Sequence, residues 1–266
     1  MLSNLEITRY SRNMLLQGVG KKGQIQLKNS IVSIIGAGGL GSVVSLYLAA
    51  GGVGEIRIFD SDTLDLTNLQ RQILYDTDDI GRAKSQLSRD RLRALNPEIN
   101  IREMEVRITK ENIGEFLQSS HLVLEGSDNF ETKFLVNDYC VLNSIPLIIA
   151  GILRFEGQVL GIQKNTPCYR CTFLEPPEAD SVPNCAEAGV LGSVAGVVGS
   201  IQASEALKYL LFGTSELFGK ILFCNLLTMD FRKIERQKNK NCPLCGINPI
   251  YQDLSHHHTE MGSCDL

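Results

Sequence analysis

A glycine-rich stretch near the start of the chain has the spacing of a turn that holds phosphate groups. The letters GAGGLG follow the β-branched run Ile31–Ile35 and place Gly36, Gly38 and Gly41 in the pattern G-x-G-x-x-G. Glycine permits a tight turn and lets a phosphate approach the backbone closely. The helix expected to follow would offer unpaired N–H groups and a partial positive charge to the same phosphate. The pattern therefore predicts a nucleotide site between a strand and a helix.

The first acid beyond this turn leaves the kind of nucleotide open. Asp60 ends the next expected strand, residues 55–60, where its carboxylate can accept hydrogen bonds from ribose hydroxyls. A glycine turn followed by such an acid is typical of NAD-dependent oxidoreductases. Taken alone, these residues favour that class of enzyme.

Further polar residues near the expected strand ends point to a triphosphate. Asn68 and Arg71 come just after the ribose strand, Lys84 opens the next helix, and Asp128 with Asn129 directly follows a fourth strand. The two cations would neutralise charge on a leaving pyrophosphate, and the carboxylate would hold Mg²⁺, which prefers oxygen ligands. Hydride transfer requires none of these groups. Judged singly, each of these residues is more typical of a solvated surface charge, so the inference depends on their joint placement.

Four cysteines form two C-x-x-C pairs, Cys168 with Cys171 and Cys242 with Cys245, about seventy residues apart. Four thiolates from two such pairs suit tetrahedral Zn²⁺. The long separation means that the metal would fasten the C-terminal segment to the rest of the domain. A redox dithiol is the alternative, and the sequence favours zinc because two pairs are present and neither lies at the glycine turn.

The other cysteines and the histidines give weaker signals. Cys185 follows an acidic, proline-bearing stretch, residues 173–184, that is typical of a mobile loop. Its thiol is either chemically active or passive, and the residues alone do not decide. The run His256–His258 lies in residues 251–266, which we expect to be a flexible polar tail, so the histidines favour chance over metal binding.

Strands and helices that alternate along the chain predict the fold class. The pattern indicates a Rossmann-like, doubly wound, mostly parallel α/β sheet, continued by an antiparallel C-terminal part with a zinc-stapled segment. The expected strands are residues 31–35, 55–60, 99–106, 121–125, 146–150, 155–163 and further ones within 220–231. The expected helices are residues 5–16, 39–50, 83–95 and 189–211.

Composition and charge exclude several other classes of protein. The chain has 266 residues and a net charge of −4, which argues against a nucleic-acid-binding domain. Residues 31–54 carry no charge, but glycines interrupt them, so we expect no membrane span. The N-terminus lacks the pattern of a secretory signal, and C-x-x-C pairs without one fit a cytoplasmic protein.

Taken together, the motifs resemble the ThiF/MoeB/HesA family, bacterial relatives of ubiquitin-activating enzymes. The resemblance extends over about residues 5–247. The stretches that carry it, in order, are RYSRNMLLQG, GAGGLGS, DSDTLDLTNLQRQILY, GRAKSQ, GSDNFETK, PCYRC, NCAEAGVLGSVAGVVGSIQASEALK and CPLCG. RQILYDTDDIGRAKSQ and NCAEAGVLG look more like the thiamine branch, closest to ThiF, than like the molybdopterin branch.

The resemblance implies an activity, its cofactors and its partners. Such enzymes use ATP and Mg²⁺ to adenylate the C-terminal glycine carboxylate of a ubiquitin-like sulfur carrier protein that ends in Gly-Gly, and they release pyrophosphate. The carrier then receives sulfur as a thiocarboxylate, here from a separate donor protein. Residues 1–250 would be one adenylating domain, with a nucleotide-binding half at 1–150 and a carrier-binding and zinc half at 151–250. A non-catalytic scaffold that binds ubiquitin-like proteins is a further alternative.

The resemblance also assigns roles to residues of this chain. Gly39 and its neighbours would contact the nucleotide, Asp60 the ribose, and Asp128 the Mg²⁺. Arg12 would reach the ATP site of the opposite subunit in a homodimer. Cys185 stands where a cysteine can form a covalent link to the carrier, although members of the family differ in whether they depend on it. Gln70, Asn68, Arg71 and Lys84 would lie around the triphosphate, and the four paired cysteines would hold a structural zinc. Asn13 and Ser127 stand where the family usually has Gln and Thr, which leaves the chemistry plausible.

Overall fold

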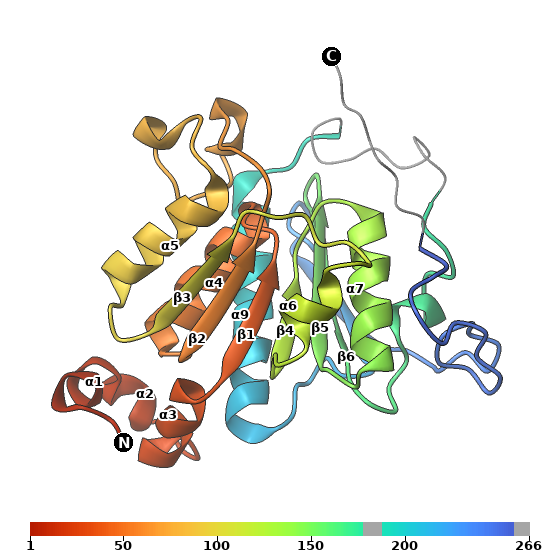
Figure 1. Cartoon of the computed structure of the whole chain (residues 1–266), viewed down its shortest axis with the longest axis horizontal. Coiled ribbons are helices and arrows are strands. Elements are labelled where there is room, and N and C mark those ends of the chain that lie inside the picture. The colour runs from red at the N-terminus through yellow and green to blue at the C-terminus, as the bar shows by residue number, and fades with distance from the viewer. Residues whose placement is uncertain (178–187, 258–266) are drawn as a thin grey trace.

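The computed structural model describes residues 1–177 and 188–257, and within them eight strands form a single sheet. The strand order is β3-β2-β1-β4-β5-β6-β7-β8 (Figure 1). Neighbouring strands from β3 to β5 pair in parallel, and those from β5 to β8 pair antiparallel. The strands are β1 (Ile31–Ile35), β2 (Glu55–Phe59), β3 (Asn100–Met104), β4 (Leu122–Glu125), β5 (Leu147–Leu153), β6 (Glu156–Ile162), β7 (Lys220–Asn225) and β8 (Asp230–Glu235).

Helices cover both faces of the sheet and give the chain two hydrophobic cores. One core joins the sheet to α4 (Gly39–Gly51), α5 (Lys84–Leu95) and α9 (Gly192–Phe212). The other joins it to α6 (Ile113–Leu117) and α7 (Phe130–Leu142), and it includes two of the paired cysteines. Figure 1 shows α7 and α9 on opposite faces. This arrangement confirms the predicted fold class.

Three short helices, α1 (Asn4–Arg9), α2 (Ser11–Met14) and α3 (Gly20–Lys28), precede the first strand. Figure 1 places them beside the edge at which the parallel strands begin. Ser3 caps α1, because its hydroxyl accepts the Glu6 N–H at 3.1 Å while the Glu6 carboxylate accepts the Ser3 N–H at 2.7 Å. None of the described helices is long and apolar enough to cross a membrane.

The structure supplies helices that the sequence pattern does not predict. Helix α3 contains two glycines and three lysines, so its apolar positions do not show the spacing of a helix face. Helix α7 is buried over most of its length, and the buried side chains include the polar ones of Lys133, Asn137 and Asp138. Those residues interrupt the apolar pattern, and their partners lie far away in the sequence.

The segment after residue 250 is partly packed, which corrects the expectation of a free tail from residue 251 onward. Tyr251 and Leu254 pack against the core beside α7. His256 and His257 each place Nε2 at 2.8 Å from Asp138 Oδ2 on α7. Residues 258–266 lie outside the described part of the chain, as do Cys185 and most of the acidic stretch 173–184.

Candidate active site

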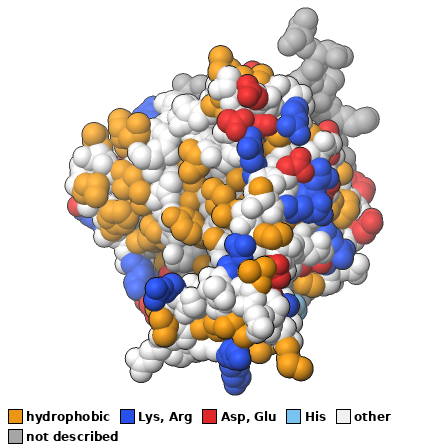
Figure 2. Space-filling model, turned by 90° about the vertical axis from the view of Figure 1, so that its left-hand side faces the viewer, with side chains coloured by type: hydrophobic (Ala, Val, Ile, Leu, Met, Phe, Trp, Pro, Cys, Tyr) orange, Lys and Arg blue, Asp and Glu red, His pale blue; other side chains and the backbone are white. Residues whose placement is uncertain are grey.

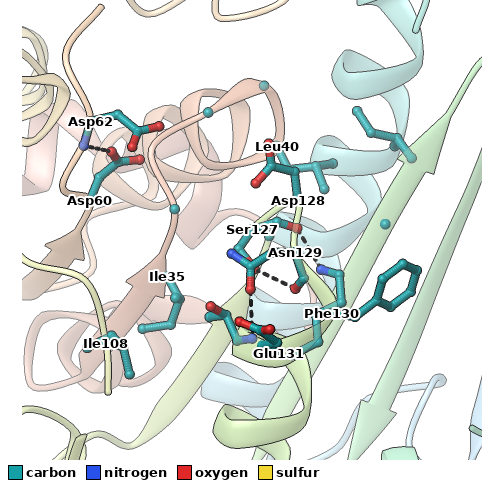
Figure 3. A pocket seen from close by; sticks show the side chains of 18 of the residues that line it. Ile35, Leu40, Asp60, Asp62, Ile108, Ser127, Asp128, Asn129, Phe130 and Glu131 are labelled. Carbon is teal, nitrogen blue, oxygen red and sulfur yellow. Dashed lines mark hydrogen bonds between the residues drawn. The ribbon is translucent and has the colours of Figure 1, made fainter. Parts of the chain in front are cut away.

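A cavity of about 970 Å³ lies at the carboxyl ends of the parallel strands. In open α/β sheets this edge is where ligands bind. Predicted site residues from five separate segments line it: Gly36, Gly38, Gly39, Asp60, Arg71, Lys84, Asp128 and Asn129. Figure 3 shows Asp60 and Asp62 on one side of the glycine turn, with Ser127, Asp128 and Asn129 on the other.

The glycine turn is fixed by backbone contacts that only glycine allows. Gly36 has φ of 91°, in the left-handed region that glycine favours. A Cβ on Gly41 would lie 1.9 Å from the carbonyl oxygen of Gly36, so this glycine lets α4 start close against β1. Gly41 is not part of the cavity wall. Its role is therefore to shape the turn, while Gly36, Gly38 and Gly39 form the wall.

Asp60 holds the two sides of the turn together. Its Oδ2 accepts the Ala37 N–H at 2.7 Å, and its Oδ1 accepts the Asp62 N–H at 2.9 Å. Burial raises the pKa of Asp60, although these two hydrogen bonds and nearby Lys84 oppose the rise. The side chain lines the cavity, where a carboxylate could still accept hydrogen bonds from a ribose.

The two predicted cations both line the cavity, but one is paired with a carboxylate and the other is not. Lys84 is buried and forms an ion pair with Asp62, Nζ to Oδ2 at 2.8 Å. Arg71 donates from Nη1 to the Thr67 carbonyl at 3.1 Å, and no described residue forms a salt bridge with it. Its aliphatic part lies over Gly39, because a Cβ there would be 3.4 Å from Arg71 Cγ. The Arg71 charge is therefore available to an anion in the cavity.

Besides Gly41, three further predicted nucleotide-site residues do not line this cavity. The Asn68 carbonyl oxygen Oδ1 accepts the Asp65 N–H at 3.3 Å, closing a short 3₁₀ turn, Leu66–Asn68. The Gln70 backbone carbonyl packs against α9, since a Cβ on Gly192 would lie 2.0 Å from it. Arg12 is exposed on α2, among the N-terminal helices. The geometry therefore argues against direct contact between a nucleotide and Asn68, Gln70 or Arg12 of the same subunit.

Sequence analysis did not predict the buried ion pair at the base of this cavity. Lys133 on α7 pairs with Glu125 at the end of β4, and both side chains are buried. Lys133 Nζ also donates to the carbonyls of Ser127 at 2.7 Å and Ala150 at 2.9 Å. Glu125 accepts the Ser127 N–H at 2.8 Å and the Ser127 hydroxyl. The pair therefore fixes the backbone that carries Asp128.

Burial raises the pKa of Glu125, and Lys133 is the main group that opposes the rise. We expect Lys133→Met to destabilise the chain by about 3–5 kcal/mol, because it leaves a buried carboxylate without its cation. Adding Glu125→Gln should restore part of this loss, since the second change removes the unpaired charge. Urea unfolding of both variants measures the effect; equal stability of wild type and Lys133→Met would show that the pair contributes nothing.

The four paired cysteines converge on one point, as the sequence predicts. The Sγ atom of Cys168 lies 3.3–3.9 Å from those of Cys171, Cys242 and Cys245, and Cys171 Sγ lies 3.4 Å from Cys245 Sγ. Sulfurs bound to one tetrahedral zinc at about 2.3 Å would be about 3.8 Å apart. Disulfide sulfurs would be about 2.05 Å apart, and all four thiols are free. The cluster can therefore hold a metal ion.

Comparison with known proteins places the chain in a family. The sequence profile of the ThiF family matches residues 10–244. The chain belongs to the ThiF family. A relative in it, the sulfur carrier protein adenylyltransferase of Thermus thermophilus, is 44% identical over 255 residues, 94% of each chain. The SAMP-activating enzyme E1 of Haloferax volcanii is 42% identical and covers 92% of this chain, which spans 91% of that protein.

Solved structures agree with this placement of the ThiF-family chain. A crystal structure of E. coli MccB with ATP matches it with a TM-score of 0.80 at 26% identity. The match covers 92% of this chain and 75% of that one. The comparisons confirm the predicted family and fold class, and they confirm the predicted enzyme class, an adenylyltransferase.

Proposed function

We propose that the chain adenylates the C-terminal glycine carboxylate of a ubiquitin-like sulfur carrier protein, using ATP and releasing pyrophosphate. The observation that carries the proposal is the joint placement of a glycine turn, two cations and an unpaired carboxylate around one cavity. The names of the relatives from Thermus thermophilus and Haloferax volcanii support a carrier protein as the substrate. A ThiS-like carrier is our first candidate, and a MoaD-like carrier is the second.

The reaction needs positioning and charge stabilisation more than a protein nucleophile. A carboxylate oxygen of the carrier attacks the α-phosphorus of ATP, and the bond from that phosphorus to the bridging oxygen of pyrophosphate breaks. Pyrophosphate leaves with the electron pair of this bond. Arg71 and Lys84 stabilise the charge that builds on it, while the N-terminus of α4 and the glycine turn hold phosphate oxygens.

Asp128 is the residue that would hold Mg²⁺. Its side chain is exposed to the cavity, and no hydrogen bond or salt bridge engages it within residues 1–177 and 188–257. A free carboxylate beside the triphosphate fits the preference of Mg²⁺ for oxygen ligands. When bound, Mg²⁺ would neutralise part of the phosphate charge. At the cysteine cluster, four thiolates at these separations fit a tetrahedral Zn²⁺ ion.

A homodimer would explain where Arg12 acts. The outer surface of α4 and α9 has a shallow hollow lined by apolar side chains, among them the exposed Tyr47 and Ile73. Gly196 faces open space there, and Leu15 and Leu16, close to Arg12, are also exposed. Figure 2 shows hydrophobic side chains gathered on one half of the drawn face. A second copy seated on this surface would bring its Arg12 to a cavity that the residue cannot reach in its own subunit.

Mixing two inactive variants tests this arrangement. Arg12→Ala and Asp128→Ala should each be nearly inactive, but subunit exchange should restore about a quarter of wild-type activity, because half of the dimers are mixed and each has one intact site. Pyrophosphate exchange after unfolding and joint refolding measures the recovery. No recovery, although mass analysis shows mixed dimers, would place Arg12 outside the partner's site.

The function itself is tested by ATP–pyrophosphate exchange with carriers ending in Gly-Gly. Exchange should require both Mg²⁺ and an intact C-terminal glycine, and comparing ThiS-like with MoaD-like carriers would separate the two pathways. NAD binding without ATP binding would instead support an oxidoreductase, and binding of a carrier without exchange would support a scaffold. For the sulfur transfer that follows adenylation, we propose a covalent role for Cys185 and a separate sulfur donor protein. We also propose that the protein acts in the cytoplasm.

A further inference from the structure

A second group of metal-ligand side chains lies outside the cavity and the cysteine cluster. It consists of Asp138 on α7 with His256 and His257 of the C-terminal segment. The candidate ligand atoms of these three residues lie within 4.8 Å of one another. Asp138 is fully buried, and the two histidine side chains are about 17% and 14% exposed. The nucleotide chemistry described above uses none of them.

The hydrogen bonds around Asp138 leave one oxygen with more neighbours than it has lone pairs. Oδ1 accepts from Arg170 Nε at 2.9 Å and from Asn137 Nδ2 at 2.7 Å. Oδ2 accepts from Arg170 Nη2 at 2.7 Å and also lies 2.9 Å from Arg170 Nε. A carboxylate oxygen has two lone pairs. One lone pair of Oδ2 therefore remains for two imidazole nitrogens, both at 2.8 Å.

A single cation would satisfy these three atoms better than hydrogen bonds can. Both imidazoles present the same atom, Nε2, to the same oxygen. With two N–H groups, both would share one lone pair; with a cation, each nitrogen and the oxygen would donate one lone pair to it. Metal–nitrogen and metal–oxygen distances of about 2.0–2.2 Å need only small shifts from the present spacing.

The surroundings also match the outer shell of a metal site. Arg170 and Asn137 hold the carboxylate from its other side, as hydrogen-bond partners of metal-bound carboxylates do. Tyr251 stacks on the His256 ring at 3.7 Å between centroids and fixes that ring. The ligands are thus oriented before an ion arrives.

We propose that Asp138, His256 and His257 form a second metal site, which takes a divalent transition cation such as Zn²⁺ or Co²⁺. Two imidazoles and one carboxylate are ligands that suit these ions. Three protein ligands leave a coordination position for water. The site would fasten residues 251–257 to α7, beside the segment that the cysteine cluster fastens. It does not depend on the adenylation proposed above.

Cobalt titration of the full-length protein, purified with its cysteine site filled, tests the proposal. Co²⁺ bound by nitrogen and oxygen gives weak visible bands without the thiolate charge-transfer absorption of a cysteine site. Wild type should bind one further equivalent of Co²⁺, and this cobalt should show the weak visible bands without thiolate charge-transfer absorption. His256→Gln and His257→Gln should each bind at least about tenfold more weakly. Glutamine keeps an N–H donor for Asp138, so a merely hydrogen-bonded contact would survive these changes.

Two further variants separate a built site from chance binding by histidines. His121→Gln, which removes a histidine elsewhere on the surface, should bind cobalt like wild type. Asp138→Asn should also bind about tenfold more weakly while it still melts cooperatively. The proposal is overturned if wild type takes up no equivalent beyond the cysteine site. It is also overturned if both glutamine variants bind as tightly as wild type, or if a folded Asp138→Asn variant does.

Discussion

Arg71→Ala is expected to lower carrier-dependent ATP–pyrophosphate exchange by about 10²–10³-fold, the usual cost of removing one group that stabilises charge in the transition state. Arg71 lines the cavity, and among the described residues its guanidinium donates one hydrogen bond, to the Thr67 carbonyl. Because no described residue forms a salt bridge with Arg71, we expect the Arg71→Ala variant to stay folded. Because the residue would act on the leaving pyrophosphate, kcat should fall more than the affinity for ATP.

Arg102→Ala is the matched control for this change. Arg102 is an exposed arginine on β3 that contacts Glu55, away from the cavity wall. Its removal should leave exchange unchanged. Asp128→Ala should resemble Arg71→Ala and should also flatten the dependence on Mg²⁺ concentration. Normal exchange by a folded Arg71→Ala variant would refute the triphosphate assignment, whereas loss of exchange together with a lowered melting temperature would leave only a structural role.

The second large effect is expected from loss of the cysteine-bound metal. Structural zinc sites of this kind contribute roughly 10–16 kcal/mol of apparent binding energy, and this energy is lost when a ligand thiolate is removed. Cys242→Ser should therefore lower the metal content and lower the melting temperature by more than about 10 °C, at about 2–4 °C per kcal/mol in a domain of this size. Calorimetry and metal analysis measure the two outcomes.

Cys224→Ala provides the comparison, since Cys224 is buried in the other core, away from the four-cysteine cluster, and its thiol donates to the Gly157 carbonyl at 3.4 Å. It should keep the metal and lose about 1 kcal/mol, the typical effect of one substitution. If Cys242→Ser melts like Cys224→Ala, the four thiols are not a structural metal site. A redox dithiol would then be favoured, and oxidation should join the thiols in pairs.

The parallel half of the fold was predictable because its signals are local. Ile31–Ile35 is a short apolar run that ends in glycine, and the structure gives β1 these same bounds. The glycine turn and the residues after each strand end could be placed together, since parallel strands end at one edge of a sheet. The spacing of the four cysteines in two C-x-x-C pairs also predicts that their thiols lie close together.

The rest could not be predicted, because it depends on contacts between distant residues. In the sequence, Lys133 has the appearance of a surface charge on a helix. Only the structure shows that it forms a buried salt bridge with Glu125. His256 and His257 look like chance histidines in a polar tail because the residue they contact, Asp138, lies more than a hundred residues earlier. Asn68 and Gln70 show the opposite error, since sequence proximity to Arg71 did not place their side chains in the cavity wall.

Helix α7 joins two parts of the molecule that carry different chemistry. Its N-terminus is capped by Asn129 at the cavity, and nine residues later, about 14 Å along the axis, it presents Asp138 to the C-terminal segment. Arg170, between two cysteines of the four-thiol cluster, forms a salt bridge with the same carboxylate. One helix therefore links the C-terminal segment and the cysteine cluster to the loop that carries Asp128, so that the position of this loop depends on both ends of α7.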